Sequence, residues 1–184
     1  MSNSICPWWM GYVLINPIRR FIQNPDRILS EYVSKGMNVL EVGGGMGFFT
    51  IPLAKMAGKE GHVMSVDLQE KMLESLTKRI QKSGFSDTIE TRRCTDNSLL
   101  LETFADKFDF ALAFAVVHEV PDKDRLFREI YAALKQEGKL LIAEPKGHVS
   151  ENDLAKSTSL AEKEGFRVIQ KPIIKKSRSV LLMK

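Results

Sequence analysis

Short apolar runs and amphipathic stretches alternate along the chain from residue 37 onward. Runs rich in aliphatic and β-branched residues predict strands at 37–42, 62–67, 88–93, 108–114 and 138–144. Between these runs, apolar positions three or four residues apart predict helices at 48–58, 69–83, 98–104 and 122–135. This alternation is typical of a parallel sheet with helices on both faces.

The same pattern continues toward the end of the chain. A helix is expected to begin at Ser150 or Asn152 and to run through Glu164. Apolar runs at 166–169 and 179–183 then predict two further strands. The chain therefore carries seven predicted strands.

The segment that is most informative about function joins the first predicted strand to the first helix. The strand ends in Glu41, and Gly43, Gly45 and Gly47 follow at alternate positions. Glycine permits positive φ and lets a ligand approach the main chain without meeting a Cβ. A strand, a glycine turn and a helix N-terminus form the usual site for a nucleotide-like ligand on an open α/β sheet.

The glycine spacing separates the classes of ligand. A dinucleotide fingerprint would need a glycine at position 48, where the chain has Phe48, and no Lys-Ser/Thr pair follows for a triphosphate loop. The observed E-x-G-x-G-x-G pattern resembles the first motif of class I S-adenosylmethionine-dependent methyltransferases. The resemblance extends from about residue 25 to the C-terminus.

The resemblance implies a doubly wound α/β sheet of seven mostly parallel strands, in the order 3-2-1-4-5-7-6, with an antiparallel pair at the end. It also implies that Glu41 and the three glycines lie against the amino-acid end of S-adenosylmethionine. The alternative for Glu41 is a strand-end acid that caps backbone amides of the turn. The expected organisation is one domain over 1–184, with an N-terminal helical segment or lid at 1–35 and a cofactor-binding core at 36–184.

Acids after the second and third predicted strands are candidates for contacts with adenosine. Asp67 lies about 20 residues beyond the glycine turn, where a carboxylate can accept hydrogen bonds from both ribose hydroxyls. Capping of the next helix by Asp67 is a compatible alternative, and Leu68 is expected to pack around the adenosine. The resemblance assigns Asp96, with Thr95 beside it, to the adenine, and the alternative for Asp96 is a helix N-cap.

The exit of the fourth predicted strand carries the candidates for chemistry. Because ligands bind at the carboxyl ends of strands in such sheets, Ala115 and His118 are expected near the transferred methyl group. Residues 115–122 resemble the loop of small-molecule methyltransferases, including the quinone-biosynthesis type. His118 is the candidate general base because histidine has an unperturbed pKa near 6.5, and a loop-orienting role is the alternative.

Other polar groups near this loop are weaker candidates. Glu119 is expected to face solvent rather than to polarise His118, and Glu144 and His148 leave the fifth strand on the same side of the sheet. Methyl transfer from a sulfonium to a nucleophilic acceptor is mainly a problem of alignment, which can remove roughly 7–11 kcal/mol from a barrier. A strong base is therefore not a requirement of the chemistry.

The N-terminal segment has an unusual composition. It holds Trp8 and Trp9, and its residues 18–22 set an apolar face against a basic one, namely Ile18, Phe21 and Ile22 against Arg19 and Arg20. Three interpretations remain open: a lid over the acceptor pocket, packing on the sheet or in a homodimer, and an anchor at a membrane surface. A lid with these side chains favours an apolar acceptor.

Composition limits the remaining classes of function. The chain has 184 residues, of which 43% are hydrophobic and 27% charged, as expected for one globular domain. Its two cysteines, Cys6 and Cys94, suit neither a disulfide framework nor a metal site, which favours the reducing cytoplasm, no bound metal and an inert Cys94. The uncharged run 1–18 is too short to span a membrane and lacks the basic start of a signal peptide.

These observations predict a cytoplasmic S-adenosylmethionine-dependent methyltransferase that acts on a small, partly apolar acceptor. An RNA or protein methyltransferase, and a non-catalytic cofactor-binding module that needs a partner, remain as alternatives. Nucleic acid is disfavoured because the net charge is only +4 and no aromatic residues interleave the late basic cluster of Lys171, Lys175, Lys176 and Arg178. Arsenite methylation is disfavoured by the small number of thiols.

Overall fold

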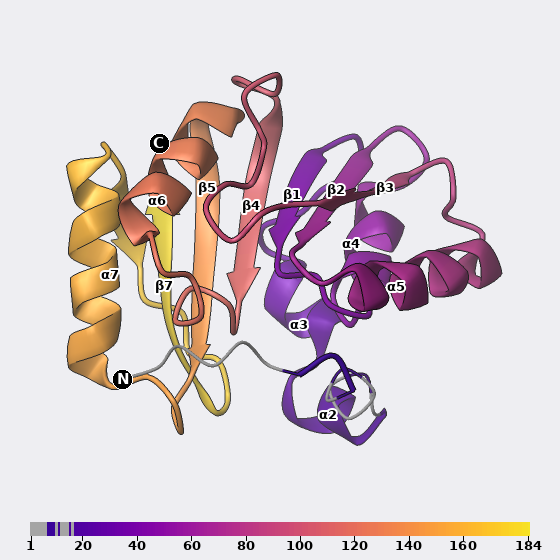
Figure 1. The fold of residues 1–184 in the computed structure, drawn as a ribbon, viewed down its shortest axis with the longest axis horizontal. Helices are drawn as coiled ribbons and strands as arrows, with labels where there is room; N and C mark the ends of the chain where they lie inside the picture. Colours follow the sequence, from indigo (N-terminus) through magenta and orange to yellow (C-terminus); the bar gives the residue numbers. More distant parts are fainter. Residues whose placement is uncertain (1–6, 10, 12–14, 16) are drawn as a thin grey trace.

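A seven-stranded sheet forms the centre of the molecule in a computed structural model that describes residues 7–9, 11, 15 and 17–184 (Figure 1). The strands are β1 (Asn38–Val42), β2 (His62–Asp67), β3 (Ile89–Arg93), β4 (Phe108–Phe114), β5 (Leu134–Pro145), β6 (Arg167–Gln170) and β7 (Ser177–Met183). Their order is β3-β2-β1-β4-β5-β7-β6. Strands β1 to β5 pair in parallel, and β7 is antiparallel to both of its neighbours. The predicted fold class and strand order are confirmed.

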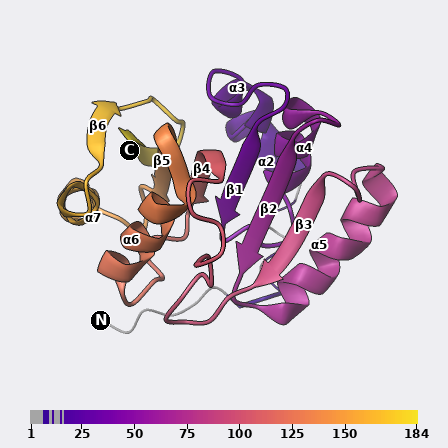
Figure 2. The same ribbon diagram turned by 90° about the horizontal axis from the view of Figure 1, so that it is seen from above.

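Helices cover both faces of this sheet (Figure 2). They are α2 (Pro17–Ile22), α3 (Pro25–Leu29), α4 (Thr50–Ala57), α5 (Glu70–Ser83), α6 (Lys123–Ala133) and α7 (Glu151–Lys163). Helices α3, α4 and α5 contribute to one apolar cluster, whereas α6 and α7 contribute to a second cluster on the opposite face. Because both faces of the sheet are covered by helices, the sequences of β1 and β4 are nearly continuous apolar runs.

The predicted helix at 98–104 is wrong. The segment between β3 and β4 contains turns instead, and Leu100 has a φ of 57°, which lies outside the helical region. The amide of Leu99 donates to the Glu129 carboxylate at 2.6 Å, which holds the segment against α6. Leu99 and Leu101 are buried while Leu100 between them is exposed, and this alternation of period two does not fit a helix.

Two helix starts are now defined. Helix α4 begins at Thr50 rather than at residue 48, because residues 45–49 form turns that use positive φ at Gly45 and Gly47. Helix α7 begins after Ser150, whose hydroxyl accepts from the amide of Asp153 in a capping box, which resolves the choice between Ser150 and Asn152. Among the described residues, no helix combines the length and apolarity needed to cross a bilayer.

Candidate functional site

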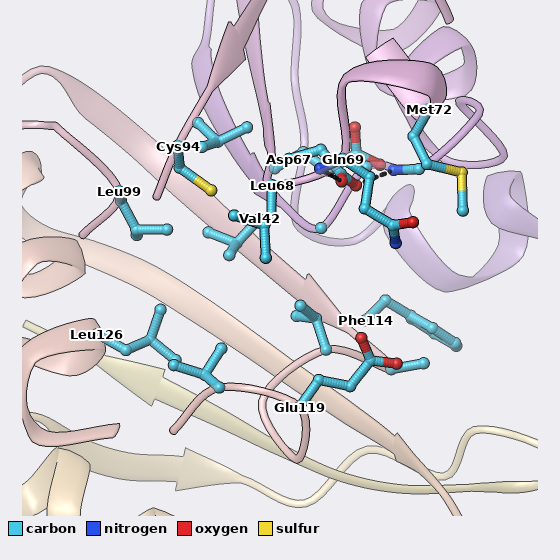
Figure 3. A pocket seen from close by; sticks show the side chains of 18 of the residues that line it. Val42, Asp67, Leu68, Gln69, Met72, Cys94, Leu99, Phe114, Glu119 and Leu126 are labelled. Atoms are coloured by element: carbon cyan, nitrogen blue, oxygen red, sulfur yellow. Dashed lines mark hydrogen bonds between the residues drawn. The ribbon is translucent and has the colours of Figure 1, made fainter. Parts of the chain in front are cut away.

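A pocket of about 400 Å³ opens at the carboxyl ends of the parallel strands (Figure 3). This volume lies within the range typical of small-molecule sites. Asp67 and Leu68 lie on one side of the pocket, and Phe114 and Glu119 lie across from them. The lining includes all but one of the predicted site residues, namely Glu41, Gly43, Gly45, Asp67, Leu68, Thr95, Asp96, Ala115 and His118.

The three predicted glycines have different physical roles. All have positive φ, with values of 72° at Gly43, 55° at Gly45 and 86° at Gly47. Gly43 and Gly45 line the pocket, and a Cβ on Gly45 would meet no atom within 4 Å. Gly47 does not line the pocket, and a Cβ there would overlap Leu76 of α5. The structure shows a role for Gly47 in packing against α5, and its expected cofactor contact stays a prediction.

A fourth glycine, Gly44, was not singled out by the motif. A Cβ on Gly44 would overlap the Ser65 hydroxyl and lie 2.7 Å from Oε2 of Glu41. The glycine at this position therefore lets two polar side chains of β1 and β2 approach the turn from below. The sequence shows a run of three glycines here, but only the neighbouring strand reveals which of them is needed for close packing.

Glu41 is buried beneath the turn, with 3% of its surface exposed. Its Oε2 accepts hydrogen bonds from the hydroxyls of Thr50 at 2.5 Å and Ser65 at 2.8 Å, rather than from the backbone amides that a cap would use. Burial raises the pKa of Glu41 to about 7, although the two hydroxyls act in the opposite direction. A cation bound nearby would favour the ionised form.

Asp67 connects the glycine turn to the start of α5. Its Oδ2 accepts from the amide of Gly45 and its Oδ1 accepts from the amide of Gln69, each at 2.8 Å. Burial raises the pKa of this carboxyl, and the backbone hydrogen bonds oppose the rise. Each carboxylate oxygen has a second lone pair, so both oxygens can also accept from a ligand. The N-cap position of α5 is Gln69, whose side chain makes no capping hydrogen bond, so the predicted cap at Asp67 is wrong, whereas a ligand contact of Asp67 stays a prediction.

The segment after β3 forms another wall of the pocket. Thr95 is held by its amide and hydroxyl, which both contact the carbonyl of Ser98, at 2.9 and 3.3 Å. Asp96 is exposed and lines the pocket, and its alternative role as a cap is removed because no helix follows it. Burial, assisted by the charge of Asp67, raises the pKa of Cys94 to about 11, so this cysteine remains a thiol as expected. Cys6 lies outside the described residues.

The exit of β4 is shaped by a buried acid on β5. Ala115 has a φ of 58°, which turns the chain away from the sheet. The next two amides, of Val116 and Val117, donate to Oε1 of Glu144 at 3.2 and 2.9 Å. Glu144 Oε2 forms a short hydrogen bond with Nδ1 of His118, and this bond raises the pKa of His118 above its usual range. Glu144 therefore orients the imidazole from below.

The two other polar neighbours of His118 differ in whether they line the pocket: Glu119 does and His148 does not. The expectation that Glu119 faces solvent is wrong: it lines the pocket, with Oε1 3.9 Å from Nε2 of His118. The reason is a tight turn in which the Glu119 amide donates to the Val116 carbonyl. His148 is exposed and lies outside the pocket lining, although its ring centre is 5.8 Å from that of His118.

The N-terminal segment reaches the pocket through Gly11, Ile15 and Arg19. The guanidinium of Arg19 lies 4.2 Å from the ring centre of Phe48, and burial lowers its pKa to about 10. Arg19, predicted to share a basic face with Arg20, therefore lines the pocket, whereas Arg20 is exposed. Phe21, predicted on the apolar face of this segment, is 88% exposed. The side chain of Ile18 lies outside what the structure describes.

Comparisons with known proteins agree on one family. Residues 33–178 match a family model described as a methyltransferase domain. A demethylmenaquinone methyltransferase of Lactobacillus johnsonii is 32% identical over 112 residues, or 61% of this chain and 45% of that protein. An arsenite methyltransferase of Rattus norvegicus is 27% identical over 143 residues, or 69% of this chain and 39% of that protein. The chain thus spans less than half the length of these two relatives.

Solved structures include matches over nearly the whole chain. The crystal structure of a SAM-dependent methyltransferase from Aquifex aeolicus superposes with a TM-score of 0.87 at 24% identity. The superposition covers 97% of this chain and 99% of that one. At this identity the match shows the fold.

The close packing at Gly44 predicts a specific sensitivity. Gly44→Ala should lower the free energy of unfolding by about 1–3 kcal/mol, because the added Cβ overlaps the Ser65 hydroxyl. Gly147→Ala is the matched control, since a Cβ there meets nothing within 4 Å and its φ is not positive. Urea unfolding measures both, and equal stability of the two variants would contradict the packing role.

The raised pKa of Glu41 predicts a pH dependence of stability. Its folded value of about 7 exceeds the reference value of 4.5, so its contribution is fully present below pH 4.5 and is lost as pH rises through 7. The unfolding free energy of the native chain minus that of Glu41→Gln should therefore fall by up to about 3 kcal/mol between pH 4 and pH 8. Chemical unfolding across this range tests it, with exposed Glu60→Gln as the control for loss of one carboxylate. A Glu41→Gln difference that stays constant with pH would refute the assignment.

Proposed function

This chain belongs to the methyltransferase-domain family, and from that premise we propose that it transfers the methyl group of S-adenosylmethionine to a small, partly apolar acceptor. The strand order and the family match make it a class I S-adenosylmethionine-dependent methyltransferase by family and fold. The observation that carries the proposal is a single pocket shared by the glycine turn, Asp67 and an oriented histidine. Residues 36–184 act as the core, and within the N-terminal segment 1–35 the pocket-lining residues Gly11, Ile15 and Arg19 act as part of a lid.

The residues present fit this cofactor. Open space above Gly45 lets a ligand lie against the main chain. The charged side chains among the described lining residues are mainly carboxylates, with two arginines: Glu41, Asp67, Asp96, Glu119, Asp122 and Glu129 with Arg19 and Arg125. This balance suits a cationic ligand without phosphates better than a dinucleotide or a nucleoside triphosphate.

Each end of the pocket has its own role in the proposal. At the adenosine end, Asp67 accepts from the ribose hydroxyls, Leu68 packs against the sugar and base, and Thr95 and Asp96 contact the adenine. At the amino-acid end, Glu41 favours the ammonium, while Gly43, Gly45 and Ala115 provide close backbone approach. S-adenosylmethionine supplies an electrophilic methyl group on a positively charged sulfur.

His118 is proposed as the general base. Because Glu144 engages Nδ1, the lone pair of the neutral ring resides on Nε2, and His118 lines the pocket. Nε2 is then placed to take the proton of an acidic hydroxyl on the acceptor as the nucleophilic atom attacks the methyl group. Glu144 acts through His118 as a positioning residue, and it also stabilises the imidazolium that results.

A quinol-like acceptor is the favoured class. The named Lactobacillus johnsonii relative is a demethylmenaquinone methyltransferase, and apolar side chains such as Leu68, Leu99 and Leu126 line this pocket. In a quinol, removal of a phenolic proton makes the adjacent ring carbon nucleophilic, and the ring proton leaves after the new C–C bond forms. Arsenite is disfavoured because Cys94 is a buried thiol with a pKa of about 11.

The ribose assignment predicts the effect of removing Asp67. Asp67→Ala should weaken S-adenosylmethionine and S-adenosylhomocysteine alike, by about 10- to 150-fold, because charge-assisted hydrogen bonds to the hydroxyls are lost. Isothermal titration calorimetry measures both ligands. Glu70→Gln is the control, since it also removes a carboxylate near the start of α5, but one that is exposed and paired with Arg93. Unchanged affinity in a folded Asp67→Ala protein would remove the assignment.

The base assignment predicts a pH profile. His118→Asn should lower kcat for a reduced naphthoquinone by at least about 100-fold while leaving S-adenosylhomocysteine affinity unchanged. In the native chain, activity should fall as pH drops through the raised pKa of His118. Glu144→Gln should move this acidic limb to lower pH, because the hydrogen bond that raises the pKa is weakened. Steady-state rates as a function of pH measure these effects.

His148→Asn is the matched control, since His148 is an exposed neighbour of His118 outside the pocket lining. Native activity in this variant together with loss in His118→Asn supports the assignment. The purified chain should also be tested against arsenite and bulk transfer RNA. Turnover of either in preference to the quinol would replace the proposed acceptor class, and cofactor binding without turnover of any acceptor would favour a non-catalytic module.

A further inference from the structure

Three segments that are distant in the sequence form one surface at the carboxyl edge of the sheet. They are residues 17–23, 146–148 and 171–178, here called the carboxyl-edge surface. The Gln23 side chain donates to the Lys175 carbonyl at 3.3 Å and to the Ser177 hydroxyl at 3.1 Å. The Lys146 amide donates to the Lys176 carbonyl at 3.0 Å. Figure 1 shows α2 and the turns that follow β5 and precede β7 at the lower edge of the molecule.

This surface carries charge of one sign. Its three sequence segments contain no Asp or Glu, but they contain Arg19, Arg20, Lys146, Lys171, Lys175, Lys176 and Arg178. Arg19 turns into the pocket, and Arg20 lies 3.8 Å from Asp26. The four lysines are all exposed. A patch of exposed lysines without acids attracts an anionic partner.

Large apolar side chains project from the same surface. Ile173 is fully exposed at 102%, and Phe21 is 88% exposed. Apolar tips surrounded by lysines are the pattern of interfacial segments, in which the apolar group enters the boundary of the acyl chains and the ammonium groups meet lipid phosphates. A second copy of the chain would bring like charges together, and single-stranded RNA would use several stacking rings, whereas Phe21 is the one exposed Phe, Tyr or Trp described in these segments.

We propose that the carboxyl-edge surface docks on anionic phospholipid bilayers, with Phe21 and Ile173 in the interface and the four lysines on lipid phosphates. The surface borders the pocket, because Arg19 of α2 and Pro145, which precedes Lys146, both line it. Docking would therefore place the pocket entrance near the lipid. The inference that the acceptor reaches the pocket from the bilayer rests on the proposed apolar acceptor. The inference that the surface docks on a bilayer rests on the surface alone.

Co-sedimentation of the full chain with vesicles tests the docking directly. No cofactor or acceptor is added, so the result is separate from that for methyl transfer. The chain should bind vesicles of mixed phosphatidylcholine and phosphatidylglycerol, bind vesicles of pure phosphatidylcholine at least about tenfold more weakly, and lose binding as salt rises.

Two double variants separate the apolar and the electrostatic parts. The first double variant is Phe21→Ser with Ile173→Ser, and it should lower the partition coefficient at least about tenfold because the apolar anchors are lost. The second is Lys175→Glu with Lys176→Glu, and it should also lower the partition coefficient at least about tenfold, since one surface lysine contributes about fivefold. Val168→Ser is the control for the first pair, because Val168 is partly exposed but pairs with Leu182 at the far end of the hairpin. Lys59→Glu with Lys107→Glu is the control for the second pair, since both lysines are exposed and precede strands at the opposite edge.

Thermal melts establish that each variant is folded. Native binding in both controls together with loss in both test variants supports the proposal. Equal binding to neutral and anionic vesicles, or no effect of either test variant, would overturn it. The proposal also fails if the chain ignores vesicles and instead binds polyuridylate, or if it forms a dimer in solution that Phe21→Ser with Ile173→Ser abolishes.

Discussion

Two buried carboxylates hold the glycine turn in place, and the rest of the site depends on that turn. Glu41, at the end of β1, accepts from hydroxyls on α4 and β2, so it joins three elements beneath the turn. Asp67, at the end of β2, accepts the Gly45 amide and so fixes the turn from the side. Gly44 permits the contact between Glu41 and Ser65, because a Cβ there would overlap the Ser65 hydroxyl and lie 2.7 Å from Oε2 of Glu41. A shift of either acid would move the floor of the pocket.

The same physical solution recurs at β4 and β5. Where parallel strands end, backbone amides lose their ladder partners, and buried amides must find others. One carboxylate oxygen of Glu144 accepts hydrogen bonds from the amides of Val116 and Val117, and its other oxygen forms a hydrogen bond with His118. Because β4 and β5 are adjacent, the loop of one strand is held by a side chain of the next. The groups proposed for binding and for chemistry are therefore fixed by the acids that complete the strand ends.

The sequence predicted what depends on local pattern. Strands buried on both faces leave continuous apolar runs, and the E-x-G-x-G-x-G motif located the turn and its acid. The sequence could not predict contacts between residues that are distant along the chain but close in space. Leu99 and Leu101 belong to a segment predicted as a helix, yet the Glu129 carboxylate on α6 accepts the Leu99 amide and the segment forms irregular chain and turns. Glu144 emerged as the partner of His118 only because β4 and β5 lie side by side. Arg19 was assigned to a basic helical face together with Arg20, and the pattern did not show that it lies against the rings of Phe48 and Phe114.

The net charge of +4 is small, but positive and negative side chains are unevenly distributed between the pocket and the surface beside it. Carboxylates predominate among the described charged residues of the pocket lining, whereas lysines without acids occupy the neighbouring carboxyl-edge surface. Physiological salt screens charges over about 8 Å, so the carboxylates act mainly on a cofactor inside the pocket and the lysines mainly on an anionic bilayer at the surface. Arg19 lies where the two regions meet, and its aromatic neighbours keep this cation at the pocket wall. An apolar acceptor that enters from a bilayer would pass the lysines first and encounter the carboxylates only inside the pocket.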